Sequence, residues 1–263
     1  MKAPVCHASA VSATVVKAPV LSAYVGRVGT GTVPVSEIKP HPFLFDFWTF
    51  SKGNNADESR DRIVGLNNHV LRAYNFLWSP LSGYGHPDYP GAIVLDGMDD
   101  HLELVDAYFP ERDYTVITKV LPFEGQEYNR IFCIRSLKNP RVDYNYLSYE
   151  FNNSQISFNY ANGGFTGRLG GSIPGEADVL AVVRSGKRTY IYQNGMFIND
   201  YNHSQDVPNF EIYSLGNTPG WVREYFHGAF YYNAVYSGAL TTDELRTEMN
   251  ESFPLYEKII INR

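Results

Sequence analysis

From residue 43 onward the chain is a succession of short runs in which apolar and polar residues alternate, separated by glycine and asparagine turns. Alternation with a period of two is the pattern of a β-strand with one buried face. The strongest local signal lies around Asn194-Gly195, where two such runs flank a residue pair that favours a type I′ hairpin turn. Many short strands with almost no helical periodicity predict an antiparallel, two-sheet sandwich.

Residues 43–250 are predicted to form one domain, because all-β sandwiches of roughly 200–250 residues fold as single units. Hydrophobic residues make up 44% of the chain and charged residues 19%, so disorder is not expected for most of it. An aromatic share of 15% also favours strands, since aromatic side chains pack well on a pleated surface. We expect Trp48 and Trp78 to lie in the core, together with the inert thiol of Cys133.

A single helix is predicted after the last strand. Thr241 and Glu244 have the spacing of a capping box. Proline cannot continue the interior of a helix, so Pro254 predicts an end near Asn250 and a short tail over residues 251–263.

The segment 58–73 is ambiguous from its sequence. Some of its apolar residues have helical spacing, but Gly65 and Asn67 interrupt the pattern. A short helix and a loop are both compatible with it.

The first 42 residues differ in composition from the rest. Four basic residues against Glu37 give this segment a charge of +3, so residues 43–263 carry −9. Its valines are interrupted by prolines, which predicts an extended N-terminal arm rather than a domain. Prolines and Lys17 also break the apolar run that a signal peptide needs, so we do not expect export by this segment.

The arm leads to a first hypothesis on function. The arm can either wrap its own domain or dock in a larger assembly. Docking is favoured, because a segment with so little hydrophobic bulk needs an external partner to become rigid. We therefore expect residues 1–42 to anchor the chain to other subunits of a multi-protein particle, with a bacteriophage virion assembled in the host cytoplasm as the favoured case. On this hypothesis the chain is a non-enzymatic structural or decoration protein that is oligomeric in the assembly.

Net charge and apolar run lengths exclude two classes of partner. The formal net charge is −6, which argues against nucleic acid as a partner. No apolar run approaches the ~20 residues of a membrane-spanning helix. Cys6 and Cys133 are too few for a disulfide framework or a cysteine metal site.

Six segments, in this order, resemble the laminin-G-like jelly rolls of the concanavalin A-like lectin/glucanase superfamily. They include Phe-Asp-Phe-Trp-Thr-Phe at 45–50 and the stretch Ala-Ile-Val-Leu-Asp-Gly-Met-Asp-Asp-His-Leu-Glu-Leu at 92–104. The other four are 114–122, 180–184, 190–195 and 228–240 followed by Thr-Asp-Glu-Leu. The resemblance covers about residues 43–250 and implies a two-sheet jelly roll, most often used to bind glycans or proteins.

The chain also departs from the family's pattern. A Trp-His pair usual before the valine-rich strand is replaced by Glu-Ala-Asp at 176–178. An acidic pair usual in the late strand is replaced by Tyr231 and Tyr232. These departures concern function rather than fold.

Catalysis is not expected. Glycosidases of this superfamily use a strand with Glu-x-Asp-x-(x)-Glu spacing, which places two carboxyl groups across the scissile bond, and this spacing does not occur in the sequence. The chain also lacks a Gly-x-Ser-x-Gly elbow and a His-Glu-x-x-His motif, and no cofactor is implied.

Asp96, Asp99 and Asp100 form a carboxylate cluster at the end of a predicted strand. Oxygen ligands of this kind suit Ca²⁺. We nevertheless expect the cluster to shape a turn and cap backbone amides, and we predict no metal site.

A second hypothesis is a glycan-binding module or adhesin. Aromatic side chains on loops serve as platforms for sugar rings, and Trp221, Tyr144 and Tyr146 are the candidates, all expected on loops. A cell-surface glycan would then be the ligand. A glycoside-active enzyme is the third and least favoured hypothesis.

Overall fold

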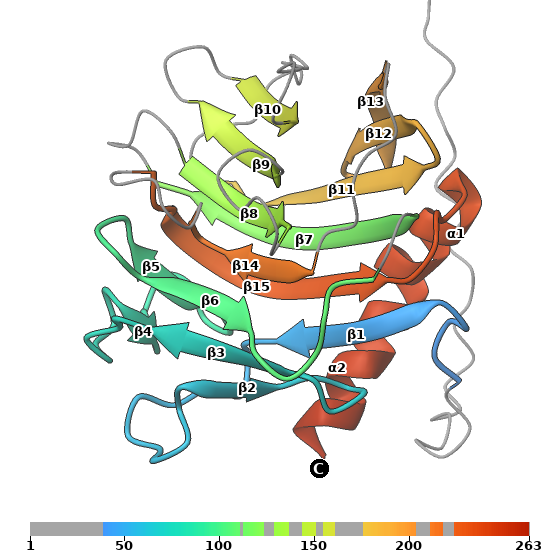
Figure 1. Ribbon diagram of the computed structural model, residues 1–263. Coiled ribbons are helices and arrows are strands. Elements are labelled where there is room, and N and C mark those ends of the chain that lie inside the picture. Colours follow the sequence, from blue (N-terminus) through green and yellow to red (C-terminus); the bar gives the residue numbers. More distant parts are fainter. Residues whose placement is uncertain are drawn as a thin grey trace, which may run out of the picture. The chain divides into compact units, whose positions relative to one another are not determined.

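The computed structural model describes residues 39–110, 113–123, 129–136, 176–203, 211–217 and 224–262, and the backbone of residues 144–150 and 155–160. Two sheets dominate this part of the chain, and Figure 1 shows them as two layers. All strand pairs in the described part are antiparallel. The prediction of an all-β, two-sheet antiparallel sandwich is therefore confirmed.

The first sheet has eight strands in the order β13-β12-β11-β7-β15-β5-β4, with β1 paired to β15. Its strands are β1 (Leu44–Thr49), β4 (Gly83–Tyr84), β5 (Ile93–Asp96), β7 (Tyr114–Pro122), β11 (Asp178–Ser185), β12 (Arg188–Gln193), β13 (Met196–Asn202) and β15 (His227–Tyr236). The β12–β13 hairpin turns at Asn194 and Gly195, whose φ angles of 50° and 74° are the positive values that a type I′ turn requires.

The second sheet has seven strands in the order β10-β9-β8-β14-β6-β3-β2. They are β2 (Arg62–Val64), β3 (Val70–Tyr74), β6 (His101–Leu104), β8 (Asn129–Arg135), β9 (Tyr144–Glu150), β10 (Gln155–Tyr160) and β14 (Ile212–Leu215). The ambiguous segment 58–73 is thus neither helix nor loop alone, because it forms β2 and the start of β3.

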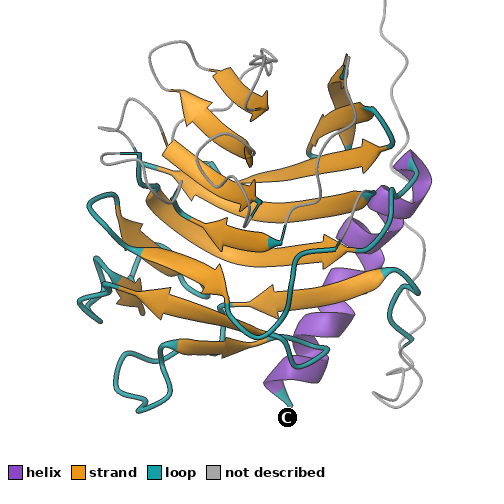
Figure 2. Cartoon of the chain, in the orientation of Figure 1, coloured by secondary structure: helices purple, strands orange, loops and turns teal. Residues whose placement is uncertain are grey.

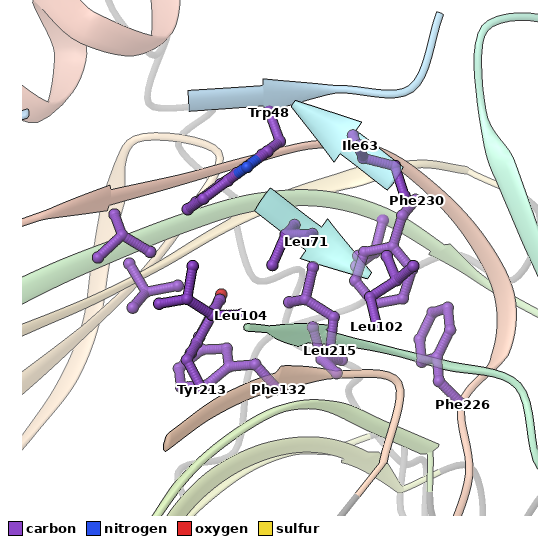
Figure 3. Close-up of a cluster of buried hydrophobic side chains, with 14 of the residues drawn as sticks. Trp48, Ile63, Leu71, Leu102, Leu104, Phe132, Tyr213, Leu215, Phe226 and Phe230 are labelled. Carbon is purple, nitrogen blue, oxygen red and sulfur yellow. The ribbon is translucent and has the colours of Figure 1, made fainter. Parts of the chain in front are cut away.

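The main core lies between the two sheets, and Figure 3 shows part of it. Trp48 and Phe230 come from the first sheet, while Phe132 and Tyr213 come from the second, and all are buried. The Tyr213 hydroxyl donates to Asn233 Oδ1 at 2.8 Å, so a buried hydrogen bond joins β14 to β15. The expected core position of Trp48 is confirmed, and Cys133 is buried as expected.

A run of helix covers the other face of the first sheet (Figure 2). It consists of α1 (Thr242–Thr247), a π-helical turn (Glu248–Ser252) and α2 (Phe253–Ile261). The predicted capping box at Thr241 and Glu244 is present. No helix in the described part of the chain is long and apolar enough to cross a membrane.

The expected end of this helix near Asn250 is wrong. Pro254 lies in the first turn of α2, directly after the π-helical turn, and therefore stands inside the run of helix that it was expected to end. The π-helical turn before it also widens the backbone where the proline ring would otherwise clash. Phe253 and Tyr256 then pack on Phe47, with ring centroids 5.0 and 5.6 Å away, so burial favours continuation of the helix.

Candidate functional site

A cavity of about 330 Å³ lies beside the β2–β3 hairpin. Strand β3 and the segments before β2 and after β3 provide its walls. Its lining residues are Glu58, Arg60, Asp61, Ala73, Asn75, Phe76 and Trp78. One aromatic wall with several hydrogen-bonding groups is the composition of a small-ligand site.

Phe76 and Trp78 form the aromatic wall, and the Tyr84 ring stacks on Trp78 outside the cavity lining. The centroids of Phe76 and Trp78 are 5.2 Å apart, and those of Trp78 and Tyr84 are 6.0 Å apart. The segment is held by backbone bonds between Ser79 and Ser82 and by the Ser82 hydroxyl, which accepts from the Leu77 amide at 2.8 Å. The stack therefore has a defined position next to the cavity.

Trp78 differs from its expected place in the core. It packs against the core but is only partly buried, and it also lines the cavity. Its φ angle of 53° lies in the left-handed region, which is uncommon for a bulky residue. The tertiary contacts with Phe76 and Tyr84 hold it in this conformation, because local preference would not.

The polar wall contains one guanidinium group and two carboxyl groups. The Arg60 guanidinium lies 5.4 Å from the centroid of the Trp78 ring, and its Nη1 donates to the Asp57 carbonyl at 3.4 Å. Asp61 forms an ion pair with Arg72 at 3.3 Å, and Glu58 is exposed. In the described part of the chain Arg60 forms no ion pair, and the residue lines the cavity.

Arg60 also lines a second cavity, of about 430 Å³, together with Tyr84. Burial raises the pKa of the Tyr84 hydroxyl well above its usual range, and the charges of Asp57 and Asp61 add to the effect. The hydroxyl therefore stays protonated, and it donates to the Arg60 carbonyl at 3.4 Å. The other residues that line the second cavity include Lys52, Asn54, Arg62 and Ile260.

The three aspartates singled out in the sequence lie together at the end of β5. One carboxylate oxygen from each of Asp96, Asp99 and Asp100 lies within 4.8 Å of the others. The Asn75 side chain donates to the Asp99 carbonyl at 3.1 Å, so the cluster adjoins the cavity. The expected turn is also present, because Asp100 Oδ2 accepts from the Asp96 amide at 3.0 Å.

The residues expected to form a glycan platform are not gathered here. Tyr144 and Tyr146 belong to strand β9 rather than to a loop, which corrects that expectation. They pair with Arg135 and Cys133 of β8, and β8, β14 and β6 separate β9 from β3. Their sequence alternates cleanly, and pairing with β8 satisfies the backbone groups that a loop would leave to solvent. Trp221 lies outside the described residues.

The sequence did not indicate Arg60 or Asn75 as site residues, and it predicted a core position for Trp78. One signal was present: Trp78 stands directly before Ser-Pro, at the start of a stretch with the composition of a loop. A large aromatic residue at such a boundary can face solvent on one side.

A family model described as the concanavalin A-like lectin/glucanases superfamily matches residues 96–246. No curated protein matches the sequence.

Two solved structures share the fold. Domain 4 of AbnA, a GH43 extracellular arabinanase from Geobacillus stearothermophilus in complex with arabinotriose, superposes with a TM-score of 0.56. It is 18% identical, and the match covers 77% of this chain and 96% of that domain. The Trypanosoma rangeli sialidase superposes with a TM-score of 0.60 at 14% identity, over 82% of this chain. This chain spans only 34% of that sialidase.

Proposed function

The chain belongs to the concanavalin A-like lectin/glucanase superfamily, and we propose that it binds glycans, without hydrolysing them, at the cavity beside Trp78. The observation that carries this proposal is the joint lining of one cavity by an aromatic ring and several hydrogen-bonding side chains.

A sugar ring presents a face of C–H groups and a rim of hydroxyl groups. The Trp78 ring offers an apolar surface of matching size, and its stacking partners hold it in place at little cost in conformational entropy. Arg60 can donate to hydroxyl or carboxylate oxygens, whereas Glu58 can accept from hydroxyl groups. The Asn75 amide can do both.

The proposal is tested with a glycan array and with arabinotriose as a single soluble probe. Trp78→Ala should weaken binding by about tenfold or more, which corresponds to about 1.4 kcal/mol. Trp78→Phe keeps an aromatic face and should retain part of the affinity. Because Trp78 also contacts the core, Glu58→Ala provides a second cavity variant at an exposed position that should fold normally.

The matched control is Tyr108→Ala, which removes a 71% exposed aromatic side chain that does not line the cavity. Glycan binding that survives both cavity variants but is lost in Trp221→Ala or Tyr144→Ala would place the site on the platform expected from the sequence. Absence of binding to every glycan tested would reject the proposal, and turnover of a β-glucan or arabinan panel would reject its non-enzymatic part.

A second candidate function is attachment to a larger particle through the N-terminal arm, for example as a decoration protein of a bacteriophage virion. The anchoring of the arm's exit point supports it. The His41 amide donates to the Tyr256 hydroxyl at 3.0 Å, and His41 Nε2 lies 3.6 Å from Glu244 Oε1. Tension on the arm would thus be transmitted to the helices that cover the first sheet. In this case the sandwich is the displayed part, and glycan binding and attachment are compatible.

A further inference from the structure

We propose that the second cavity, of about 430 Å³, binds a small molecule that carries an oxyanion group, such as a carboxylate, sulfate or phosphate. Three basic residues line it, Lys52, Arg60 and Arg62, with Asp57 as the one acidic residue of the described lining. The lining therefore has a formal charge of +2, whereas residues 43–263 together carry −9. Positive charge gathered around a hollow in an otherwise acidic chain raises the local concentration of anions.

Carboxylates of the described residues do not neutralise these cations. None of the three basic residues forms an ion pair with an acidic residue in the described part of the chain. Asp61, which stands between Arg60 and Arg62 in the sequence, pairs instead with Arg72 at 3.3 Å. Asp57 contacts Arg60 through its backbone carbonyl, which accepts from Nη1 at 3.4 Å. An anionic ligand would thus supply a counter-charge to the basic lining.

The walls of the cavity are held in place before any ligand binds. The Asn55 side chain donates to the Tyr84 carbonyl at 2.8 Å and accepts from the Tyr84 amide at 2.7 Å, which ties the segment before β2 to β4. Gly53 lies against the Tyr84 ring, and a side chain at this position would overlap with it. Lys52 Nζ donates to the Ile260 carbonyl at 3.3 Å, which links the same segment to the end of α2. A preformed site loses little conformational entropy on binding.

The chemistry of the lining suits a small organic anion. A guanidinium group presents a planar fork of donors that matches a carboxylate or a phosphate, and a lysine adds a compact charge. Arg62 is exposed, so a ligand can reach it from solvent. Val64 and Tyr84 offer apolar surface to the carbon skeleton of the ligand. Neutral side chains complete the hydrogen-bonding part of the lining: Thr49, Asn54, Ser59 and Asn68.

The test is isothermal titration calorimetry of the full chain at constant ionic strength and without sugar. Inorganic phosphate, inorganic sulfate and citrate are separate probes, and the one bound most tightly identifies the class of oxyanion. We expect saturable binding with a dissociation constant of about 1 mM or tighter. Arg62→Gln should weaken this binding by about tenfold or more, because a charge-assisted hydrogen bond is lost. Lys52→Gln, at a second exposed position of the lining, should also weaken it.

Arg246→Gln is the matched control, since it removes the same charge from an exposed arginine of α1 that lines neither cavity. The proposal is overturned when none of the three probes shows saturable binding. It is equally overturned when Arg62→Gln and Arg246→Gln weaken binding to the same extent, which would show an effect of net charge alone.

This inference does not depend on glycan binding. Arg62 does not line the cavity beside Trp78, so Arg62→Gln should bind arabinotriose as the unmodified chain does. Saturable binding of an oxyanion by a chain that binds no glycan would support this inference while rejecting the proposed function.

Discussion

At the scale of single residues, Asp46 shows how a polar group in a buried strand organises its surroundings. The residue is 0% exposed, and its carboxylate accepts from the amides of Phe47, Asn67 and His69 at 2.7–2.8 Å. A Cβ atom at position 65 would lie only 2.4 Å from this carboxylate. Gly65 and Asn67 interrupt the helical pattern in the sequence. Their role is to let the β2–β3 turn pack closely against Asp46 and bond to its carboxylate.

A pH-dependent loss of stability is predicted at His203. Burial lowers the pKa of His203 to about 4, with the positive charge of Arg184 as the second cause. In the unfolded chain the imidazole takes up a proton as the pH falls below about 6.5, but in the folded chain it does so only near pH 4. The stabilising contribution is thus present above pH 6.5 and is lost as the pH falls towards 4.

The measurement is the free energy of unfolding by urea between pH 7.5 and 4. Relative to the unmodified chain, His203→Gln should flatten the profile over pH 6.5–4 by on the order of 2 kcal/mol, because glutamine does not titrate. The glutamine amide can still bond to Thr189, whose hydroxyl lies 2.9 Å from His203 Nε2. Parallel profiles for the two proteins would contradict the prediction.

At the scale of elements, Glu248 fastens the C-terminal helices to the first sheet. Its Oε2 accepts from the hydroxyls of Tyr236 at 2.7 Å and Tyr256 at 3.1 Å, and its Oε1 accepts from Ser252 at 2.9 Å. Burial raises the pKa of Tyr236 well above its usual range, and the charge of Glu248 adds to this, so the hydroxyl remains a donor. The π-helical turn begins at Glu248, which gives this local irregularity a structural role.

We predict that Tyr236→Phe lowers the free energy of unfolding by about 1–3 kcal/mol, since it leaves a buried carboxylate with one donor fewer. Chemical denaturation monitored by tyrosine and tryptophan fluorescence measures the change. Tyr108→Phe is the control, because this exposed hydroxyl should contribute nothing measurable. Equal stability of the two variants would show that Glu248 is satisfied by its other partners.

The element scale also shows where sequence patterns succeed and fail. The strands and the Asn194-Gly195 hairpin follow from period-two alternation and from turn chemistry, which act over a few residues. The length of the C-terminal helix does not follow from local pattern. Packing of Phe253 and Tyr256 on Phe47 outweighs the local effect of Pro254. The position of Trp78 does not follow from the pattern either, because it depends on how its ring packs against Phe76 and Tyr84.

At the scale of the whole molecule, residues 39–262 contain the core clusters and their hydrogen-bond network. We predict that deletion of residues 1–38 leaves the melting temperature of the sandwich unchanged but abolishes assembly into larger particles. The cut is placed at residue 38 because His41 contacts the C-terminal helices. Size-exclusion chromatography with light scattering, comparing the full chain with the deletion variant, measures the assembly.

An assembly that persists after the deletion would rule out the arm as its anchor. A deletion variant that melts earlier would instead show that the arm stabilises its own domain. Glycan binding should survive the deletion in either case, because the cavity beside Trp78 is built from residues 58–78.

The sequence by itself determined the fold class, the hairpin, the capping box and the carboxylate cluster, because each depends on residues close together in the chain. Only the tertiary structure decided that Arg60, Asn75 and Trp78 share a cavity, and that Tyr144 and Tyr146 are separated from it by three strands. The cavity depends on side-chain packing around the β2–β3 hairpin, which the pattern of apolar and polar residues does not show. The separation of β9 from it depends on strand order, which is set by long-range burial rather than by local pattern.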